Sequence, residues 1–357
     1  MIDKILNELN LNALIITDPY NMRHVSGFRG GEGALYISAA QKVLITDSRY
    51  TEQAAKESNF TVIEECRSHN RQTILKECVE KEAISGDFTM GYEDESMLCC
   101  EFARMKKALP VQVWVALEGR IDALRQVKTE EELTYLAKAE EIGDKAFTRL
   151  LKVLKPGMTE LEVAAELEYF MKQEGAEDLS FNTIVASGLN SSMPHAIPGN
   201  KKIEEGDFIT FDFGCKYKGY CSDMTRTVVL GKANEKQKEI YNVVLKAQLA
   251  GLEAVKAGIS GSSVDKVSRD IITEAGYGEY FGHGLGHSVG LFIHENPRLS
   301  PSDDTILQAG MIETVEPGIY VPGFGGVRIE DMVVVTENGC RNLAHSPKEL
   351  IEVPVEK

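Results

Sequence analysis

The stretch GDFITFDFG, residues 206–214, alternates apolar and polar side chains between two glycines. In a β-strand, Phe211 and Phe213 would share one face, and Thr210 and Asp212 would share the other. A carboxylate between two phenylalanines is partly removed from water, so it needs a charged or hydrogen-bonding partner. The stretch therefore predicts a strand that carries Asp212 into a polar site.

A related stretch, GMIETVEPG, follows at residues 310–318 and places Glu316 where the first copy has Asp212. A second pair of acids has nearly the same spacing, since Asp223 in CSDMT corresponds to Glu330 in VRIED. Two copies are too few for a solenoid. The sequence instead predicts a domain with an internal pseudo-twofold repeat and one site between its halves.

The elements before each acid pair also recur. Capping-box sequences at Thr129 and Thr159 predict two helices, and the segment KPGMT at 155–159 reappears as KAGIS at 256–260. Hydrophobic periodicity predicts the elements of this region at residues 130–154, 160–175, 181–187, 206–214, 220–230, 235–256, 262–275, 311–315 and 327–335. We expect an α+β domain over residues 127–357.

The first part of the chain, residues 1–126, alternates short apolar runs with helical patterns. Strand-like runs at 13–17, 34–37, 42–46, 60–63 and 111–115, with a helix near 50–58, are typical of an α/β layer domain. The GGEG stretch at 30–33 lacks the remaining residues of a phosphate-binding motif, so we interpret it as a turn.

Asp212 and Asp223 are separated by a segment, Lys216–Gly219, that can turn a hairpin and bring both acids to one face. Two carboxylates held this close repel each other, and one stays protonated unless a cation lies between them. The alternative is that these acids cap turns or pair with nearby Lys216 or Arg226. The second pair of acids at matching positions favours a shared site.

Histidines are concentrated in FGHGLGHSVGLFIHENP, residues 281–297, which holds three of the seven in the chain. His283 and His287 have helical spacing, but the intervening glycines disfavour a helix, so this is not a zincin motif. An extended segment that passes close to a site fits better. For any single histidine, including His294, a structural role is the alternative.

Four carboxylates carry four negative charges, which two divalent cations offset, and one imidazole adds a neutral ligand. Oxygen-rich ligation without thiolate suits manganese, our first expectation, and also cobalt, zinc or iron. Two cations roughly 3.5–4 Å apart can share a water and lower its pKa toward about 7. This set of side chains therefore predicts hydrolysis at neutral pH.

The bulk properties restrict the partners. The chain has 357 residues, 43% hydrophobic content and a formal net charge of -16, which disfavours nucleic acid and anionic membranes. Residues 1–12 carry acids and no long apolar core, so we expect no export. Seven cysteines without C-x-x-C spacing indicate reduced thiols and a cytoplasmic protein.

Together with Pro194-His195, these motifs resemble the M24-type metallopeptidases of pita-bread fold, which include aminopeptidase P, prolidase and methionine aminopeptidase. The resemblance covers about residues 129–335. It implies that Asp212 ligates one metal ion, that His287 and Glu316 ligate the other, and that Asp223 and Glu330 bridge both. Glu316 would also act as the general base.

The resemblance further implies a substrate pocket lined by His195, His283 and His294. His195 or His294 would support the tetrahedral intermediate and its leaving nitrogen. Arg328 would contact the substrate or support the ligands, and a salt bridge to a site acid is its alternative role.

The stretches NMRHVSGF at 21–28 and DSRY at 47–50 resemble the creatinase-like N-terminal domain of Xaa-Pro peptidases, which methionine aminopeptidases lack. The resemblance implies a homodimer that hydrolyses the bond between an N-terminal residue and proline. Arg298 resembles the carboxylate contact of prolidases, but both dipeptidase and aminopeptidase activities stay open. Alternatives are a general metal aminopeptidase and a non-catalytic binding module on the same fold.

Overall fold

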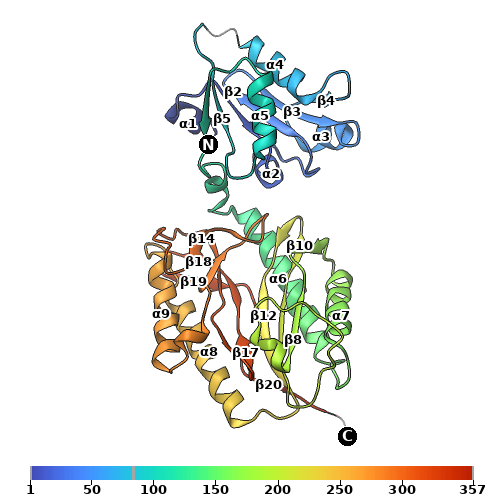
Figure 1. Ribbon diagram of the computed structural model, residues 1–357, viewed down its shortest axis with the longest axis vertical. Helices are drawn as coiled ribbons and strands as arrows, with labels where there is room; N and C mark the ends of the chain where they lie inside the picture. The colour runs from blue at the N-terminus through green and yellow to red at the C-terminus, as the bar shows by residue number, and fades with distance from the viewer. Residues whose placement is uncertain (1, 83–84, 356–357) are drawn as a thin grey trace. The chain divides into compact units, whose positions relative to one another are not determined.

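The computed structural model describes residues 2–82 and 85–355, and the chain forms two compact units, Met1–Arg125 and Gln126–Lys357. The first unit contains a six-stranded mixed sheet with the strand order β4-β3-β2-β1-β5-β6 (Figure 1). Its elements are α1 (Ile2–Glu8), β1 (Ala13–Ile16), α2 (Pro19–Ser26), β2 (Ala34–Ser38), β3 (Lys42–Asp47), α3 (Thr51–Glu57), β4 (Thr61–Glu65), α4 (Arg71–Lys81), β5 (Thr89–Tyr92), α5 (Cys99–Ala108), β6 (Val113–Ala116) and η1 (Asp122–Arg125).

Helices cover both faces of this sheet. Strand β1 shows why, since Leu14 and Ile16 pack in a cluster with residues of α1, α2 and α3, whereas Ala13 and Ile15 pack with residues of α4 and α5. A strand buried on both faces has a continuous apolar sequence rather than an alternating one. The predicted α/β layers are confirmed, although β5 was not predicted.

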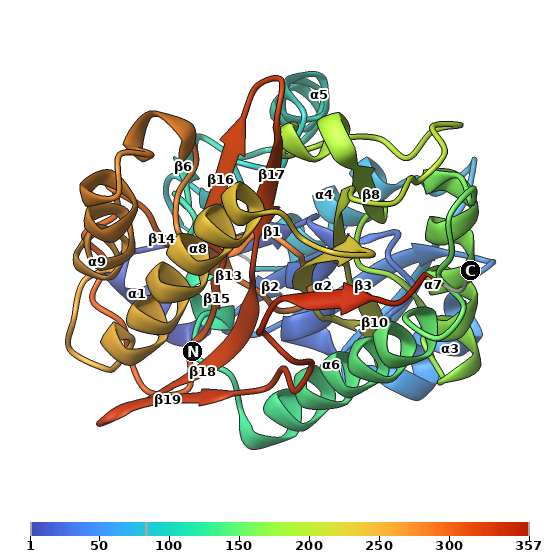
Figure 2. The same ribbon diagram turned by 90° about the horizontal axis from the view of Figure 1, so that it is seen from below.

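The second unit consists of two related halves. The first half contains α6 (Glu130–Leu150), α7 (Glu160–Gln173), β7 (Asp178–Leu179), β8 (Ile184–Ser187), η2 (Gly188–Ser192), β9 (Phe208–Phe213), β10 (Cys215–Tyr217), β11 (Tyr220–Cys221) and β12 (Met224–Leu230). The second contains α8 (Glu235–Ala254), α9 (Gly261–Glu274), η3 (Gly278–Tyr280), β13 (Gly286–Ser288), β14 (Glu295–Leu299), β15 (Ile312–Val315), β16 (Gly318–Val321), β17 (Gly325–Arg328), β18 (Asp331–Thr336), β19 (Gly339–Asn342) and β20 (Ile351–Val353). Figure 2 shows the pair α6–α7 and the pair α8–α9 on opposite sides of the strands.

Local sequence explains where these helices begin. The side chains of Thr129 and Thr159 each accept a hydrogen bond from the backbone N–H three residues further on. The carboxylates of Glu132 and Glu162 in turn accept from the backbone N–H of these threonines, so both predicted capping boxes are present. On the inner side, Phe147 of α6 lies 5.8 Å from the ring of Phe211. Each half therefore has its own apolar cluster between a helix pair and a strand.

Two predicted strands were wrong as continuous elements. Residues 220–230 divide into β11 and β12, and residues 327–335 divide into β17 and β18, with Asp223 and Glu330 in the two breaks. The backbone at the second break bonds across the halves, because Glu330 N donates to Thr225 O at 3.1 Å and Arg226 Nη1 donates to Glu330 O. The backbone groups of Glu330 therefore form hydrogen bonds between the two halves instead of within a β-ladder of the second half.

The seven cysteines, all among the described residues, form no disulfide. Among the described residues, no helix combines the length and apolar character required to cross a bilayer.

Candidate metal centre

The four acids and His287 lie on separate elements of the second unit. Asp212 is on β9 and His287 on β13, Glu316 directly follows β15, and Asp223 and Glu330 occupy the strand breaks. All five line one cavity of about 780 Å³. The structure therefore brings together every residue of the predicted ligand set.

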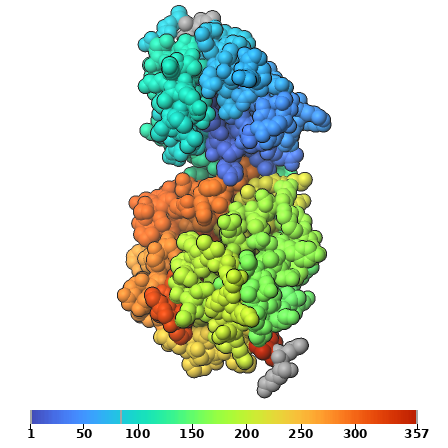
Figure 3. All heavy atoms as spheres, turned by 45° about the vertical axis from the view of Figure 1, so that its right-hand side comes forward, coloured from blue at the N-terminus to red at the C-terminus, as the bar shows by residue number. Residues whose placement is uncertain are grey.

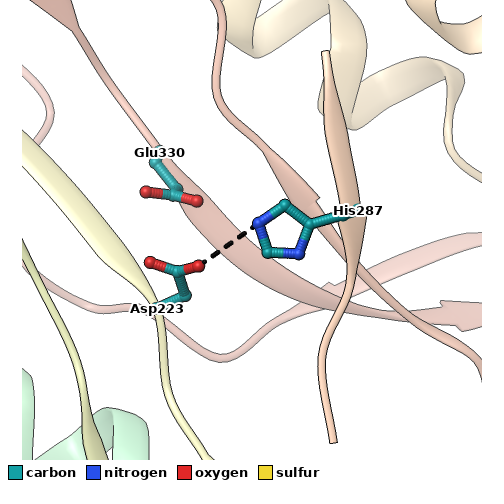
Figure 4. A group of neighbouring side chains, drawn as sticks. All are labelled: Asp223, His287 and Glu330. Carbon is teal, nitrogen blue, oxygen red and sulfur yellow. Dashed lines mark ion pairs between the residues drawn. The ribbon is translucent and has the colours of Figure 1, made fainter. Parts of the chain in front are cut away.

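His287 faces the acids through one ring nitrogen. Its Nε2 lies 3.4 Å from Asp223 Oδ2 and 3.5 Å from Glu316 Oε1, and single atoms of Asp223, His287 and Glu330 lie within 4.8 Å of one another (Figure 4). Nδ1 lies 3.0 Å from Ser288 O, which fixes the tautomer with its proton on Nδ1. Burial lowers the pKa of His287 to about 3, so the Nε2 lone pair is available to a metal ion.

The carboxyl groups of Glu316, Asp223 and Glu330 are destabilised as anions. Burial and the charge of Asp212 raise the pKa of Glu316 to about 8, against the opposing effect of Arg328. Burial and the neighbouring acids likewise raise the pKa values of Asp223 and Glu330 well above their ordinary range. Four carboxyl groups in a buried cluster need added positive charge to ionise together.

Two buried carboxylate oxygens test whether metal ions fit. Asp212 Oδ1 and Glu330 Oε1 have no hydrogen-bond partner among the described residues, although buried polar atoms are normally satisfied. Both atoms belong to the acid cluster, which also presents the Nε2 lone pair of His287. Oxygen donors with one neutral nitrogen and no thiolate fit a pair of divalent cations.

Arg328 supports the cluster from one side. Its Nη2 donates to Asp212 Oδ2 at 2.6 Å, its Nε to Thr225 Oγ1 at 3.0 Å, and its Nη1 to Tyr320 Oη at 2.8 Å. Thr225 Oγ1 in turn donates to Glu330 Oε2 at 2.7 Å. Arg328 is 3% exposed, so the salt bridge considered as an alternative is the contact that the structure contains.

Sequence reasoning missed Tyr320 and Thr225. Tyr320 lies four residues after Glu316, on the β16–β17 hairpin that also carries Arg328, and this spacing was the available signal. Burial raises the pKa of Tyr320 to about 12, so its hydroxyl stays protonated beside Arg328.

The three other predicted histidines line the same cavity. His283 Nε2 lies 2.9 Å from Tyr320 Oη, and burial lowers its pKa to about 4. His294 is exposed, and its ring centre lies 4.7 Å from that of His287. His195 is exposed on the loop after η2. All three can face a bound substrate.

The remaining cavity wall has two characters. Arg298 is half-buried at the cavity, where it can face an anionic group, and its Nη2 donates to His294 O at 3.4 Å. Phe181 and Ile184 add apolar surface from the first half. Figure 3 shows the yellow-green loops of the first half beside the orange segment that bears the histidines.

Comparisons with known proteins cover nearly the whole chain. Residues 134–337 match the model of metallopeptidase family M24, and residues 1–127 match that of the creatinase/prolidase N-terminal domain. An Xaa-Pro dipeptidase of Pyrococcus furiosus is 41% identical, with 98% of this chain and 97% of the relative covered.

Solved structures give the same result. An Xaa-Pro dipeptidase from Bacillus anthracis superposes with a TM-score of 0.94 at 42% identity, covering 98% of both chains. An X-Pro aminopeptidase from Thermotoga maritima superposes with a TM-score of 0.90 at 39% identity, covering 98% of this chain and all of that one.

Proposed function

Because this chain belongs to metallopeptidase family M24 and carries a creatinase/prolidase N-terminal domain, we propose that it hydrolyses the peptide bond between an N-terminal residue and proline. The predicted combination of an α/β domain with a pita-bread domain is confirmed by the full-length superposition. Relatives named Xaa-Pro dipeptidase at about 40% identity support the proline preference.

The convergence of four carboxyl groups and one neutral imidazole in a single cavity carries this proposal. Asp212 would hold one divalent cation, His287 and Glu316 the other, and Asp223 and Glu330 both. When bound, two divalent cations supply Lewis acidity that activates water near neutral pH and polarises the peptide carbonyl. Manganese is the expected metal, with cobalt, zinc or iron as alternatives.

Glu316 is the proposed base. Its side chain is 17% exposed and faces the cavity, where it can take one proton from the attacking water. The C–N bond then breaks, and the same proton passes to the proline nitrogen, which has no hydrogen of its own in the peptide. This transfer leaves Glu316 ionised again for the next cycle.

His195, His283 and His294 would orient the substrate. An imidazole N–H of His195 or His294 can stabilise the negative charge that develops on the carbonyl oxygen. Arg328 donates to Asp212 Oδ2 and Tyr320 Oη and also lines the cavity, where it would support the ligands or contact the substrate. Arg298 is the proposed partner of a substrate carboxylate.

Hydrolysis of Ala-Pro and of Ala-Pro-Ala, with and without a chelator and added Mn²⁺, tests the proposal. Cleavage of Ala-Pro alone identifies a dipeptidase, and cleavage of Ala-Pro-Ala identifies an aminopeptidase, as the name of the Thermotoga relative also allows. Equal rates on Ala-Ala-Ala would indicate a general aminopeptidase. A Glu316→Gln variant purified in the same way controls for contaminating peptidases, and turnover that survives the chelator would overturn the metal mechanism.

We also propose where the protein acts and what it does not bind. The absence of disulfides among its seven cysteines supports a location in the reducing cytoplasm. A net charge of -16 argues against nucleic acid or anionic membrane partners. A homodimer stays a prediction from the family resemblance, and sedimentation equilibrium measures it.

A further inference from the structure

The loop that carries His195 has an unusual balance of contacts. It runs from Ser187, at the end of β8, to Gly199, and its residues 194–198 line the cavity. Its apolar side chains point largely to solvent, since Leu189 is 60% exposed and Ile197 is 89% exposed. Burial of these side chains therefore contributes little to its conformation, which must depend on polar contacts.

Glu160, the first residue of α7, provides those contacts at both ends of the loop. Its Oε1 accepts hydrogen bonds from Ser187 N at 2.8 Å, Ser187 Oγ at 2.9 Å and Asn190 Nδ2 at 3.0 Å. Its Oε2 lies 3.1 Å from Asn190 Nδ2 and 3.4 Å from Gly199 N. One carboxylate, only 1% exposed, thus joins the two ends of the loop.

The backbone of α7 reinforces the return of the loop. Glu160 N donates to Lys201 O at 3.0 Å, and Leu161 N donates to Gly199 O at 3.1 Å. These are helix N-terminal donors, which have no partner within the helix. The first turn of α7 is therefore the base on which the loop is mounted.

The side chain of Glu160 is not needed to begin the helix. Thr159 and Glu162 already form the capping box, and Glu162 accepts hydrogen bonds from Thr159 N and Oγ1. Burying a carboxylate is costly unless it is fully hydrogen-bonded. The loop, rather than the helix, accounts for the placement of Glu160.

A second set of contacts joins the first part of the loop to the β16–β17 hairpin, which lies between Glu316 and Glu330 in the sequence. Ser191 Oγ accepts a hydrogen bond from Gly326 N of β17 at 2.8 Å, and a Cβ at Gly326 would lie 2.3 Å from Ser191 O. Arg328, on the same strand, donates to Pro194 O at 3.5 Å. The loop tip next to His195 is thus placed relative to the residues around Asp212.

We propose that Glu160 is a positioning residue that holds both ends of loop 187–199 and thereby sets the position of His195 at the scissile bond, an inference that rests on the proposed peptidase function. Small displacements of a group that meets the transition state are costly, and a shift of about 1 Å can cost about 100-fold in rate. Glu160 contacts no substrate and acts only through the loop.

The test compares Glu160→Ala with Glu160→Gln and with the control Glu166→Ala, which removes an exposed carboxylate from the same helix and keeps the capping box of Thr159 and Glu162. Hydrogen exchange of peptides spanning residues 187–199 is expected to accelerate in Glu160→Ala and to stay unchanged in the control. On Ala-Pro with Mn²⁺, Glu160→Ala should lower kcat/KM about 10- to 100-fold. Glu160→Gln retains one accepting oxygen and should lose less.

A double-mutant cycle with His195→Ala separates positioning from general damage. In the His195→Ala background, Glu160→Ala should lower kcat/KM by less than about threefold, because the group it positions is absent. An equal loss in both backgrounds, or unchanged exchange in loop 187–199, overturns the proposal. If Glu160→Ala does not fold, the exchange of Glu160→Gln decides. Exchange does not depend on turnover, so it decides the role of Glu160 even if prolyl peptides are not cleaved.

Discussion

Binding of divalent cations to the metal-free protein is expected to release protons, and the structure indicates how many. At pH 7 a carboxyl group with a pKa of about 8 is about nine-tenths protonated, so Glu316 contributes nearly one proton. Burial and neighbouring acids raise the pKa values of Asp223 and Glu330 well above their ordinary range, so their ionisation on metal binding adds to this release. His287, with a pKa of about 3, contributes none. The expected total at pH 7 is at least about one.

The same shifts fix the sign of the pH dependence of stability. A carboxyl whose pKa is raised on folding binds more protons in the folded than in the unfolded protein, so stability is lost as pH rises between the two pKa values. For Glu316 that window runs from about 4.5 to about 8. A tenfold change in an ionisation constant is about 1.4 kcal/mol, so ionisation of the coupled carboxyl cluster costs several kcal/mol of stability across this window. Metal-free protein should therefore be less stable at pH 8 than at pH 5.5, and Mn²⁺ should reverse the trend.

Isothermal titration calorimetry with MnCl₂ in buffers of different ionisation enthalpy measures the released protons directly. We expect at least about one at pH 7, and about one fewer at pH 7 for Glu316→Gln. The protons belong to the coupled cluster, so the total is the quantity to compare. Release near zero at pH 7, or equal release from the native protein and Glu316→Gln, would refute the assignment of these acids as ligands.

Three further substitutions test separate parts of the site. In steady-state kinetics, Arg298→Ala should raise KM for Ala-Pro about tenfold or more, with a smaller effect on Ala-Pro-Ala. Equal effects on both peptides would contradict a contact with the dipeptide carboxylate. Tyr320→Phe removes hydrogen bonds to Arg328 and His283 and should lower Mn²⁺ affinity about 10-fold in calorimetry, whereas unchanged affinity would exclude support of the ligands through Arg328. Asp331→Ala leaves Arg226, which is 1% exposed, without its buried carboxylate partner. The free energy of unfolding in urea should fall by about 3–5 kcal/mol, and a fall below about 1 kcal/mol would contradict this.

The sequence was informative about the acid cluster because a duplication leaves the same signal twice. Asp212 and Glu316 follow equivalent alternating strands, and Asp223 and Glu330 follow at nearly equal spacing, so each acid supports the interpretation of its counterpart. Strand alternation also predicted correctly which side of β9 is polar, since Asp212 lies opposite Thr225 while Phe211 packs against α6. Period-2 patterns depend only on local geometry.

Contacts between distant segments could not be predicted in this way. Residues 327–335 are predicted as one strand because each residue is favourable in a strand. The strand is interrupted at Glu330, whose backbone N–H donates to Thr225 O of the other half. The role of Glu160 could not be predicted for the same reason. Its sequence context indicates only the start of a helix, whereas its hydrogen-bond partners lie 27 to 39 residues further along the chain. Such contacts depend on tertiary placement, which overrides local pattern.

The repeat also explains why the centre is not symmetric. Strand β8 of the first half pairs with β9 and places Ile184 directly opposite Asp212. In the second half, the strand that lies against β15 is β13, which presents His287 to the acids. One half thus contributes an apolar wall where the other contributes His287, the proposed nitrogen ligand. Because the second half also supplies His283 and His294, the polar groups around the acids gather on one side. The apolar side chain of a bound peptide should therefore lie against Ile184 and Phe181, and its reacting carbonyl should face the histidines.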